Sequence, residues 1–536
     1  MTYMKILAVI PARAGSKGIP NKNIRIINGH PLIYYSIKNA LKSEKITDVI
    51  ISTDSPEVRI IAEQMGAMCK WRDESLCGDA VTLDAVIYDA IPKDEQWDYV
   101  VTMQPTSPTL EVETLDAAIK YTIENDLDTC ISAINAPHLS WGVKDGKKVP
   151  NYEKRLNRQF LPANYLETGA FVVSKASIVT ADTRIGAKVD VYEVSEQEAV
   201  DIDTFADLRV AAMSLNSQKV AIYVNGNNKR GIGHIYRALE IADEFYVKPD
   251  IYYDSNQTDP KVFGKTTHIL KPVNGIAELF QICKEKQYTV FINDILTTSI
   301  DYMIGLKSCI PNAKIINFED DGEGIIKADL VFNALFEDEQ FPQIHAGEKY
   351  YICGKTFMFY EPIKIKDSVK RVFISFGGAD PQNYSDRLLE MIIKPEYKDY
   401  HFIVVLGRAK YNVETLLEYN KYPNVEVLYD VSNMPELMTS CDIGITSRGR
   451  TGYELACLGI PSIAMAQNQR EEKHGFVCNE NGFSYIGLNP ADEVIEGTMK
   501  MYLSMSQKTR QHYQDMLLSH DLRGGRRRVM SLINNL

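Results

Sequence analysis

Residues 11–23 read PARAGSKGIPNKN and separate two apolar segments. The first, residues 5–10 (KILAVI), predicts a buried strand, and the second, residues 31–41 (PLIYYSIKNAL), predicts a helix with proline near its first turn. The loop between them combines glycines, which let backbone N–H groups approach an anion, with cations that neutralise it. Open α/β sheets bind their ligands at such loops, at the carboxyl ends of strands. The stretch therefore indicates an α/β fold with an anion site, although composition alone also fits an ordinary basic surface loop.

The length and composition bound what the chain can be. Its 536 residues predict two or three domains, and 45% hydrophobic and 24% charged residues are typical of a globular protein with a large core. The net charge of −12 argues against a general nucleic-acid-binding protein. Nine scattered cysteines, no signal peptide and no long apolar run predict a cytoplasmic protein that has reduced thiols and no membrane span.

The segments after the first helix continue an alternating pattern. Residues 48–54 predict a strand, residues 57–65 a helix, and residues 98–103 another strand. Such alternation predicts a parallel sheet with helices on both faces. Gln104 follows the third strand and precedes two prolines, so it sits in a rigid loop or a plain turn. Because an amide both donates and accepts hydrogen bonds, it suits the edge of a pyrimidine ring.

Two aspartates near residue 200 predict a metal site. In the segment AVDIDTFADL, residues 199–208, Asp201 and Asp203 are two positions apart and point to the same side if the segment is extended. Mg²⁺ favours a couple of carboxylates together with phosphate oxygens and water. The alternative is that Asp203 caps the helix that starts near Thr204.

The loop is not a P-loop, because G-x-x-x-x-G-K-[ST] is absent. With the Q-P-T-S-P segment at 104–108 and the D-I-D-T segment at 201–204, it resembles the signature of CMP-sialic and nonulosonic acid synthetases, the acylneuraminate cytidylyltransferases. The resemblance implies a nucleotidyltransferase that transfers CMP from CTP to a sialic-acid-like sugar with Mg²⁺. It implies CTP contacts from Ala12, Arg13, Gly15, Ser16, Lys17, Lys22, Asn23, Arg72 and Gln104.

The same resemblance assigns further roles. Arg13, Lys17 and Asp203 are the expected catalytic residues, and Asp201 and Asp203 the expected metal ligands. The sugar acid is expected to contact Gln104, Arg158 and Gln159. Arg158 suits this role because guanidinium binds carboxylate with two parallel hydrogen bonds, but it could equally form a surface salt bridge.

A second strand–loop–helix pattern begins after a polar linker. Residues 219–224 predict a strand, and Gly231, Gly233 and His234 lead into a helix. A histidine beside glycines at a helix start can hold a diphosphate and exchange a proton, or can simply cap the helix. Similar glycine turns recur at residues 377–378 and 449–452. The predicted domains are 1–216, 219–365 and 366–536.

The second half resembles the UDP-sugar hydrolase of the pseudaminic acid pathway, a relative of glycosyltransferases with two facing Rossmann-like subdomains. The likeness rests on the segments GIGHIYR, SFGGADP, TGYELACLGIP and QNQ. It implies a GT-B-like region in which His234 is catalytic. It also implies UDP contacts from Gly231, Gly233, Gly377, Gly378, Glu454, Gln467, Asn468 and Gln469.

Together the two resemblances imply a bifunctional, homodimeric enzyme of nonulosonic acid biosynthesis, of the pseudaminic or legionaminic acid type. One half would load the sugar onto CMP and the other would hydrolyse a UDP-linked amino-sugar. Four alternatives remain at this level. The first half could activate an eight-carbon acid such as Kdo, and the second could be a glycosyltransferase or a nucleotide-sugar-binding module without catalysis. A nucleic-acid-binding protein is disfavoured by the net charge.

Overall fold

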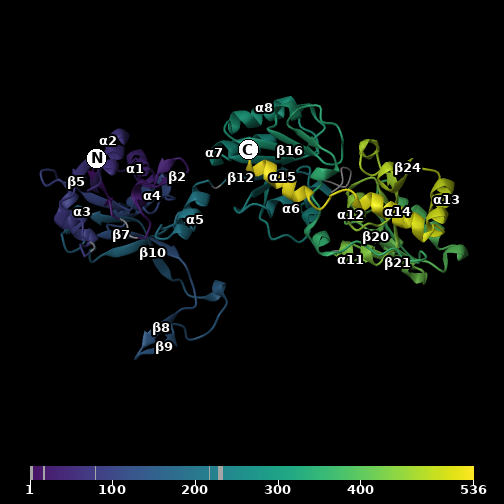
Figure 1. Ribbon diagram of the computed structural model, residues 1–536, viewed down its shortest axis with the longest axis horizontal. Helices are drawn as coiled ribbons and strands as arrows, with labels where there is room; N and C mark the ends of the chain where they lie inside the picture. The colour runs from purple at the N-terminus through teal and green to yellow at the C-terminus, as the bar shows by residue number, and fades with distance from the viewer. Residues whose placement is uncertain (1–3, 16–17, 79, 217, 227–232, 432) are drawn as a thin grey trace. The chain divides into compact units, whose positions relative to one another are not determined.

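The structure is a computed structural model that describes residues 4–15, 18–78, 80–216, 218–226, 233–431 and 433–536. The chain divides into two compact units, Met1–Ser217 and Gln218–Leu536 (Figure 1). The predicted linker after residue 216 falls at this division. In the described part of the chain, no helix has the length and apolar character needed to cross a bilayer.

The first unit is built on a seven-stranded sheet in the order β11-β7-β10-β6-β1-β4-β5. Strand β10 runs antiparallel to both of its neighbours, and the other pairs are parallel. The strands are β1 (Ile6–Pro11), β4 (Asp48–Thr53), β5 (Met68–Trp71), β6 (Tyr99–Met103), β7 (Thr129–Asn135), β10 (Tyr165–Lys175) and β11 (Val189–Glu193). The helices are α1 (Leu32–Lys42), α2 (Pro56–Met65), α3 (Leu83–Ala90), α4 (Val112–Glu124) and α5 (Phe205–Leu215), and a small hairpin pairs β2 (Ile26–Ile27) with β3 (His30–Pro31).

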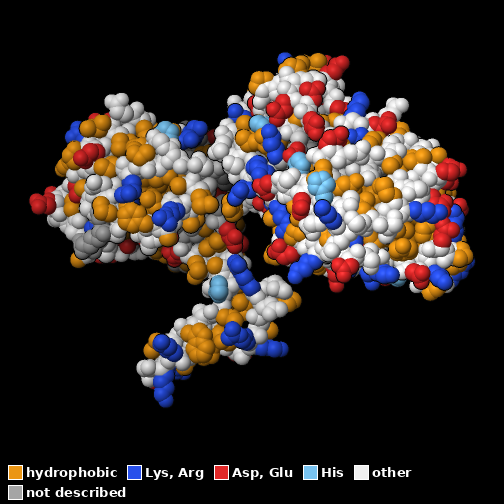
Figure 2. All heavy atoms as spheres, turned by 45° about the vertical axis from the view of Figure 1, so that its right-hand side comes forward, with side chains coloured by type: hydrophobic (Ala, Val, Ile, Leu, Met, Phe, Trp, Pro, Cys, Tyr) orange, Lys and Arg blue, Asp and Glu red, His pale blue; other side chains and the backbone are white. Residues whose placement is uncertain are grey.

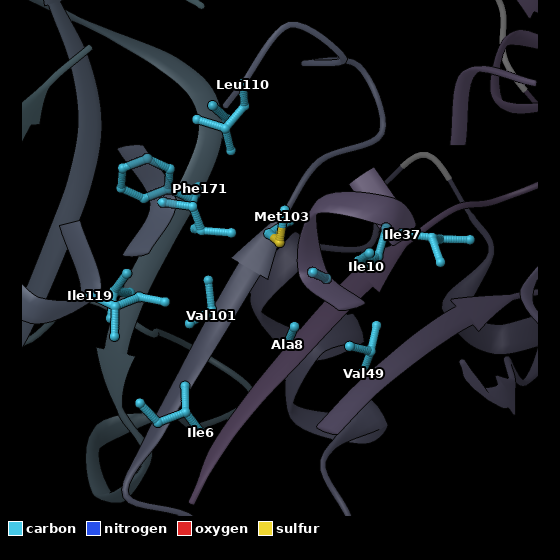
Figure 3. Close-up of a cluster of buried hydrophobic side chains, with 14 of the residues drawn as sticks. Ile6, Ala8, Ile10, Ile37, Val49, Val101, Met103, Leu110, Ile119 and Phe171 are labelled. Atoms are coloured by element: carbon cyan, nitrogen blue, oxygen red, sulfur yellow. The ribbon is translucent and has the colours of Figure 1, made fainter. Parts of the chain in front are cut away.

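Strand β1 is buried on both faces, which explains why its sequence is continuously apolar. Ile6, Ala8 and Ile10 belong to the larger core cluster, which Figure 3 shows together with side chains from β6, α1 and α4. Leu7 and Val9 belong to a second cluster on the opposite face. The loop after β1 therefore starts from a rigid point at the carboxyl edge of the sheet.

An arm leaves the sheet between β7 and β10. It carries the antiparallel hairpin β8 (Trp141–Lys144) and β9 (Lys147–Pro150), which projects from the first unit in Figure 1. Figure 2 shows hydrophobic and basic side chains gathered on this arm. Trp141 is 60% exposed and Val143 75% exposed.

The second unit has two lobes, each with an all-parallel sheet. The first lobe has the order β14-β13-β12-β15-β16-β17-β18 and the second β21-β20-β19-β22-β23-β24. First-lobe elements are β12 (Val220–Val224), α6 (Gly233–Ala242), β13 (Asp250–Asp254), β14 (Leu270–Val273), α7 (Ile276–Lys286), β15 (Val290–Asp294), α8 (Ile300–Cys309), β16 (Lys314–Phe318), β17 (Leu330–Asn333) and β18 (Ile344–Ala346). Second-lobe elements are β19 (Arg371–Ser375), α9 (Tyr384–Ile392), β20 (His401–Leu406), α10 (Val413–Leu417), β21 (Val425–Tyr429), α11 (Met434–Thr439), β22 (Ile443–Ser447), α12 (Arg450–Cys457), β23 (Ser462–Ala466), β24 (Phe483–Leu488), α13 (Asp492–Leu503) and α14 (Gln507–Leu518).

The last helix, α15 (Gly525–Asn534), returns to the first lobe. Its buried residues Val529, Met530 and Ile533 share a core cluster with the strand β12. Arg526 also donates to the Glu244 carboxylate on the first-lobe side at 2.6 Å. The range predicted as the second subdomain, 366–536, thus ends in a helix that completes the first lobe, because its apolar face is buried there.

Candidate functional sites

The predicted phosphate loop leaves β1 beside the end of β4. The backbone N–H of Ala12 donates to Ser52 O at 2.9 Å, and the N–H of Ala14 donates to the Asp54 carboxylate at 2.7 Å. Gly15 is exposed, while Ser16 and Lys17 lie outside the described residues. The loop is therefore held to the neighbouring strand by one backbone bond and one bond to a carboxylate, and Asp54 was not singled out from the sequence.

The loop and the aspartate pair lie together. Lys22 donates to Ile202 O at 2.8 Å and pairs with the Asp203 carboxylate at 3.2 Å. A Cβ on Gly18 would lie 2.9 Å from Asp203 O, so the backbones approach closely where glycine stands. Residues nearly two hundred positions apart thus meet at one edge of the sheet.

The two aspartates differ in environment. The Asp203 side chain is 75% exposed, and Thr204 rather than Asp203 caps α5, in a capping box with Asp207. Asp201 is more enclosed, and its Oδ1 is buried without a hydrogen-bond partner in the described part of the chain. Burial, reinforced by the Asp203 charge and opposed by Thr106 and Lys22, raises the pKa of Asp201.

Gln104 belongs to the same neighbourhood. A Cβ on Gly169, which has φ +72°, would lie 3.2 Å from Gln104 Nε2 and 3.5 Å from Asp201 Oδ2. Glycine at 169 therefore leaves room for the amide beside the carboxylate. The structure brings together the predicted glutamine, the predicted metal ligands and the cationic loop.

Other predicted CTP residues support the loop. Arg72 is 5% exposed and donates to Ser52 O at 2.8 Å and to Ser52 Oγ at 3.2 Å, and its burial lowers its pKa. Asn23 donates from its side-chain amide to Arg13 O at 3.0 Å. Arg13 itself reaches Cys77 O at 3.5 Å. In this structure the side chains of Arg72 and Asn23 bind the backbone of β4 and of the loop after β1.

The predicted sugar-acid residues Arg158 and Gln159 lie on the exposed arm. Arg158 pairs with Glu196 at 3.4 Å, and both side chains are more than 60% exposed. Among the described residues, the structure records no contact from either of them to Gln104. It thus records the surface salt bridge that the sequence left open as an alternative.

A separate cavity of about 660 Å³ lies between β5 and α3. Met68, Cys69 and Lys70 line one side, and Tyr88 and Lys93 line the other. None of the predicted site residues lines it.

In the second unit, the predicted histidine is buried. His234 is 5% exposed, and its Nε2 hydrogen-bonds to Asn225 O. Because a carbonyl oxygen only accepts, Nε2 carries the proton in that bond. Burial lowers the pKa of His234 to about 4, so the imidazole is neutral at pH 7 and its Nδ1 can accept a proton. Gly231 lies outside the described residues.

A buried cluster of charged side chains surrounds Arg237, which lies one helical turn after His234 on α6. Arg237 makes a two-point contact with Asp294, at 2.9 and 2.6 Å, and pairs with Glu319 at 3.3 Å. All three side chains are at most 3% exposed. Glu319 was not recognised from the sequence, because it follows an ordinary strand, β16, with no motif around it.

The second-lobe glycine turn follows β19. Gly377 has φ +73°, and a Cβ on Gly407 would lie 2.1 Å from Gly377 O, so the two turns touch. The buried ammonium of Lys410 binds the Asp380 carboxylate at 3.0 Å and fixes the turn from behind. Neither Lys410 nor Gly407 was recognised from the sequence, since no periodic pattern connects them to residues 377–378.

The remaining predicted UDP residues lie at neighbouring strand ends. Gln467 is buried and donates from Nε2 to Phe376 O at 2.5 Å, and its buried Oε1 has no hydrogen-bond partner among the described residues. Asn468 and Gln469 are exposed. Glu454 lies on α12, and burial raises its pKa to about 7 while Arg450 opposes the shift. The second unit thus contains a glycine turn after β19, a neutral histidine on α6 and a carboxylate on α12.

Comparison with known proteins extends these observations. Residues 7–220 match the cytidylyltransferase family. Pseudaminic acid cytidylyltransferase of Campylobacter jejuni is 32% identical over 221 residues, which cover 39% of this chain and 95% of that protein. CMP-N,N'-diacetyllegionaminic acid synthase of Legionella pneumophila is 42% identical over 122 residues, covering 22% of this chain and 53% of that protein.

One further relative matches both units. It is the pseudaminic acid cytidylyltransferase and UDP-2,4-diacetamido-2,4,6-trideoxy-beta-L-altropyranose hydrolase of Helicobacter pylori, 26% identical over 497 residues. The match covers 87% of this chain and 89% of that protein. The chain spans only about half to three fifths of the length of several other curated relatives.

Proposed function

The chain belongs to the cytidylyltransferase family, and from that premise we propose that its first unit transfers CMP from CTP to a nonulosonic acid and releases pyrophosphate. The observation that carries this proposal is the meeting of the cationic loop with the aspartate pair, through Lys22, Gly18 and Asp203. A triphosphate needs cations and close backbone on one side, and a carboxylate pair for its divalent ion on the other.

Asp201 and Asp203 are the residues that would hold Mg²⁺. The unpartnered buried oxygen of Asp201 and the exposed carboxylate of Asp203 suit a hard cation that shares its ligands with phosphate and water. Among the described residues no three His, Cys, Asp or Glu side chains gather to hold a metal by themselves, so the nucleotide would complete the site. When bound, Mg²⁺ would offset charge on the transferring and leaving phosphates.

The residues of the chain supply orientation and charge. The anomeric hydroxyl of the sugar would attack the α-phosphorus of CTP and lose its proton to solvent, while the bond from that phosphorus to the oxygen shared with the β-phosphate breaks and pyrophosphate leaves. Arg13 and Lys22 stand where they can neutralise the phosphates, with Lys17 as a further expected contact. Gln104 would orient the pyrimidine or the sugar beside Asp201.

Incubation with CTP, Mg²⁺ and a panel of eight- and nine-carbon sugar acids tests this function. Pyrophosphate release with a nine-carbon acid is the expected result, and release only with Kdo would transfer the assignment to an eight-carbon substrate. No release with any acid would contradict the proposal.

For the second unit, we propose hydrolysis of a UDP-linked amino-sugar. Support comes from the match that spans both units of the Helicobacter pylori protein and from the neutral, buried His234. Water would attack the anomeric carbon, His234 Nδ1 would accept a proton from it, and the bond from that carbon to the β-phosphate oxygen would break. Gly233, at the start of α6, and the glycine turn at 377–378 would hold the leaving UDP.

Measuring UDP and free sugar together tests the second activity. Equal amounts of both, with water as the only acceptor, are expected from hydrolysis. UDP release that requires an added sugar acceptor would indicate a glycosyltransferase, and UDP binding without any product would indicate a binding module.

We also propose that two chains associate through the arm. The exposed Trp141, Val143 and Phe160 give it an apolar surface that a second copy could cover. Light scattering is expected to give twice the 60.6 kDa chain mass, and a Trp141→Ser, Val143→Ser variant is expected to weaken the dimer. A monomeric wild-type protein at micromolar concentration would contradict this.

A further inference from the structure

The second unit has to supply positive charge to a nucleotide diphosphate. Hydrolysis leaves two electrons on the oxygen that links the anomeric carbon to the β-phosphate, and an arginine is well suited to stabilise that charge. Among the described residues, the arginines of this region are Arg237 on α6, Arg408 after β20, Arg448 and Arg450 after β22, and Arg470, which donates to Glu319 O after β16. Arg230 lies outside the described residues. The hydrogen-bond and ion-pair partners of each arginine decide whether its guanidinium is available to bind a phosphate.

The arginine of the GIGHIYR motif is already neutralised. Arg237 uses Nε and Nη2 on Asp294 and Nη1 on Glu319, all within the first-lobe interior. Two carboxylates therefore surround one guanidinium, and the cluster as a whole is negative when both are ionised. Because two carboxylates already neutralise Arg237, its guanidinium is not available to bind a phosphate.

The other arginines of this region are also engaged. Arg408 makes a forked contact with Asp430 at 2.9–3.1 Å, and Arg470 pairs with Asp321 at 3.1 Å. Arg448 donates to two backbone carbonyls, Val477 O at 3.0 Å and Glu472 O at 2.9 Å. These side chains hold loops in place.

Arg450 is the least engaged of these side chains: like Arg448 it has no carboxylate at ion-pair distance, but among the described residues it makes one backbone hydrogen bond where Arg448 makes two. Arg450 is the first residue of α12, and within the described ranges no carboxylate lies at ion-pair distance from it. Its guanidinium donates to Ile352 O at 3.1 Å and lies 4.9 Å from the centre of the Tyr351 ring. A planar contact on one side and a single hydrogen bond leave further N–H groups to offer.

Arg450 also stands at the meeting of the two lobes. Its Cδ would be 2.7 Å from a Cβ on Gly233, the residue before His234. Glu454 lies one helical turn further along α12, on the same face. The charge of Arg450 influences both neighbours, since it lowers the pKa of Glu454 and that of His234.

The order of groups in a nucleotide sugar fixes what must lie at this point. If Glu454 contacts the nucleoside end of UDP, as the resemblance of the second half implies, and the anomeric carbon lies at His234, the diphosphate that joins them passes between the two residues. We propose that Arg450 binds the diphosphate of the nucleotide sugar and stabilises the charge that develops on the departing nucleoside diphosphate. This inference rests on the proposed function of the second unit.

In the balanced reaction, water supplies the oxygen that becomes the anomeric hydroxyl, and His234 Nδ1 takes one proton. The electron pair of the broken carbon–oxygen bond stays on the β-phosphate oxygen, which Arg450 contacts. The proton on His234 then passes to solvent, and UDP leaves.

Equilibrium binding of UDP and of uridine to the full chain tests the role without requiring turnover. The variants are Arg450→Met, which removes the charge, and Arg450→Gln, which can still donate to Ile352 O. Arg527→Met is the matched control, since Arg527 is exposed on α15 and its loss changes the net charge equally. Any binding of UDP by the first unit is common to all of these proteins.

The expected result is a roughly 10- to 100-fold weaker UDP affinity in both Arg450 variants with unchanged uridine affinity, because a charge-assisted contact to phosphate is lost. Where UDP-sugar turnover is measured, the rate constant should fall by about 10²-fold or more. The Arg527→Met protein should match the wild type in both assays.

Unchanged preference for UDP over uridine in Arg450→Gln would overturn the proposal, and so would a wild-type protein without that preference. If Arg450→Met unfolds, Arg450→Gln decides. A wild-type protein that binds UDP through Arg450 but releases none from a UDP-sugar would support this inference and contradict hydrolysis, so the two failures are distinguishable.

Discussion

Both units have a glycine-containing segment after their first strand, but they differ in the burial of the charged side chains near it. In the first unit, Lys22 and Asp203 pair at an edge where the Asp203 side chain remains 75% exposed. In the second, Arg237, Asp294 and Glu319 are enclosed and compensate one another. The exposed pair can separate, so that Lys22 binds phosphate and Asp203 binds a metal ion. The buried cluster cannot separate at low cost and therefore fixes the structure near the neutral His234.

The comparison is tested most severely by Asp203→Ala. If the exposed pair holds the metal, pyrophosphate release should fall by about three orders of magnitude or more while UDP release by the second unit is unchanged. Asp94→Ala, at an exposed position of the same unit, is the control. Wild-type pyrophosphate release in Asp203→Ala would remove this residue from the mechanism.

Asp294→Ala breaks the enclosed cluster. Removing one partner leaves Arg237 with Glu319 alone and a cavity beside them, so the second unit should lose about 3–5 kcal/mol of unfolding free energy. Urea unfolding monitored by loss of UDP binding gives the value, and cytidylyl transfer reports whether the first unit is unaffected. A loss below about 1 kcal/mol would show that the cluster does not fix the structure there.

The His234 environment predicts an unusual pH dependence. Because burial lowers its pKa to about 4, the imidazole stays neutral and able to accept a proton as the pH falls from 8 to 5. The acid limb of kcat/KM for UDP release should therefore lie near pH 4 and not near the ordinary value of about 6.5. His234→Ala should reduce that rate by about 10²-fold or more while UDP still binds.

Because burial raises the pKa of Glu454 to about 7, the profile is also measured in Glu454→Gln, and an acid limb at pH 6.5 that persists in that variant would indicate that His234 is solvated in the working enzyme. A His234→Ala protein with wild-type turnover would remove the residue from the mechanism. The exposed His512 on α14 offers a matched control, and His512→Ala should leave the profile unchanged.

The smallest effect is expected at Arg158, on the exposed arm. Its pair with Glu196 is solvated, so Arg158→Ala should change the unfolding free energy by less than about 1 kcal/mol. If Arg158 contacts the sugar carboxylate during turnover, the KM for the sugar acid should nevertheless rise, while that for CTP should not. Unchanged KM values for both substrates would assign Arg158 to the surface alone.

Local sequence patterns predicted much of the fold. The apolar run at residues 5–10 is the buried strand β1, and residues 31–41 and 57–65 are the helices α1 and α2 within a residue or two. These signals are local, because burial on both faces of a strand and helical periodicity are written in adjacent residues. The packing of α15 against the first lobe depends on residues that are distant in the sequence, and no pattern near residue 525 predicts it.

The sites were predicted less completely. Motif residues indicated which segments matter, but not which partner each side chain would have. Arg72 and Asn23 turned out to hold backbone, Lys22 to pair with Asp203, and Arg237 to pair with two carboxylates. Such pairings depend on three-dimensional contacts between distant segments, which a single sequence does not encode in its periodicity.

The central claim is that the cationic loop and the aspartate pair form one nucleotide site. The most direct test is the affinity for CTP with and without Mg²⁺, in the wild type and in Asp203→Asn. We predict that Mg²⁺ tightens CTP binding at least about tenfold in the wild type and has no such effect in the variant. An equal effect of Mg²⁺ on both proteins would contradict the account.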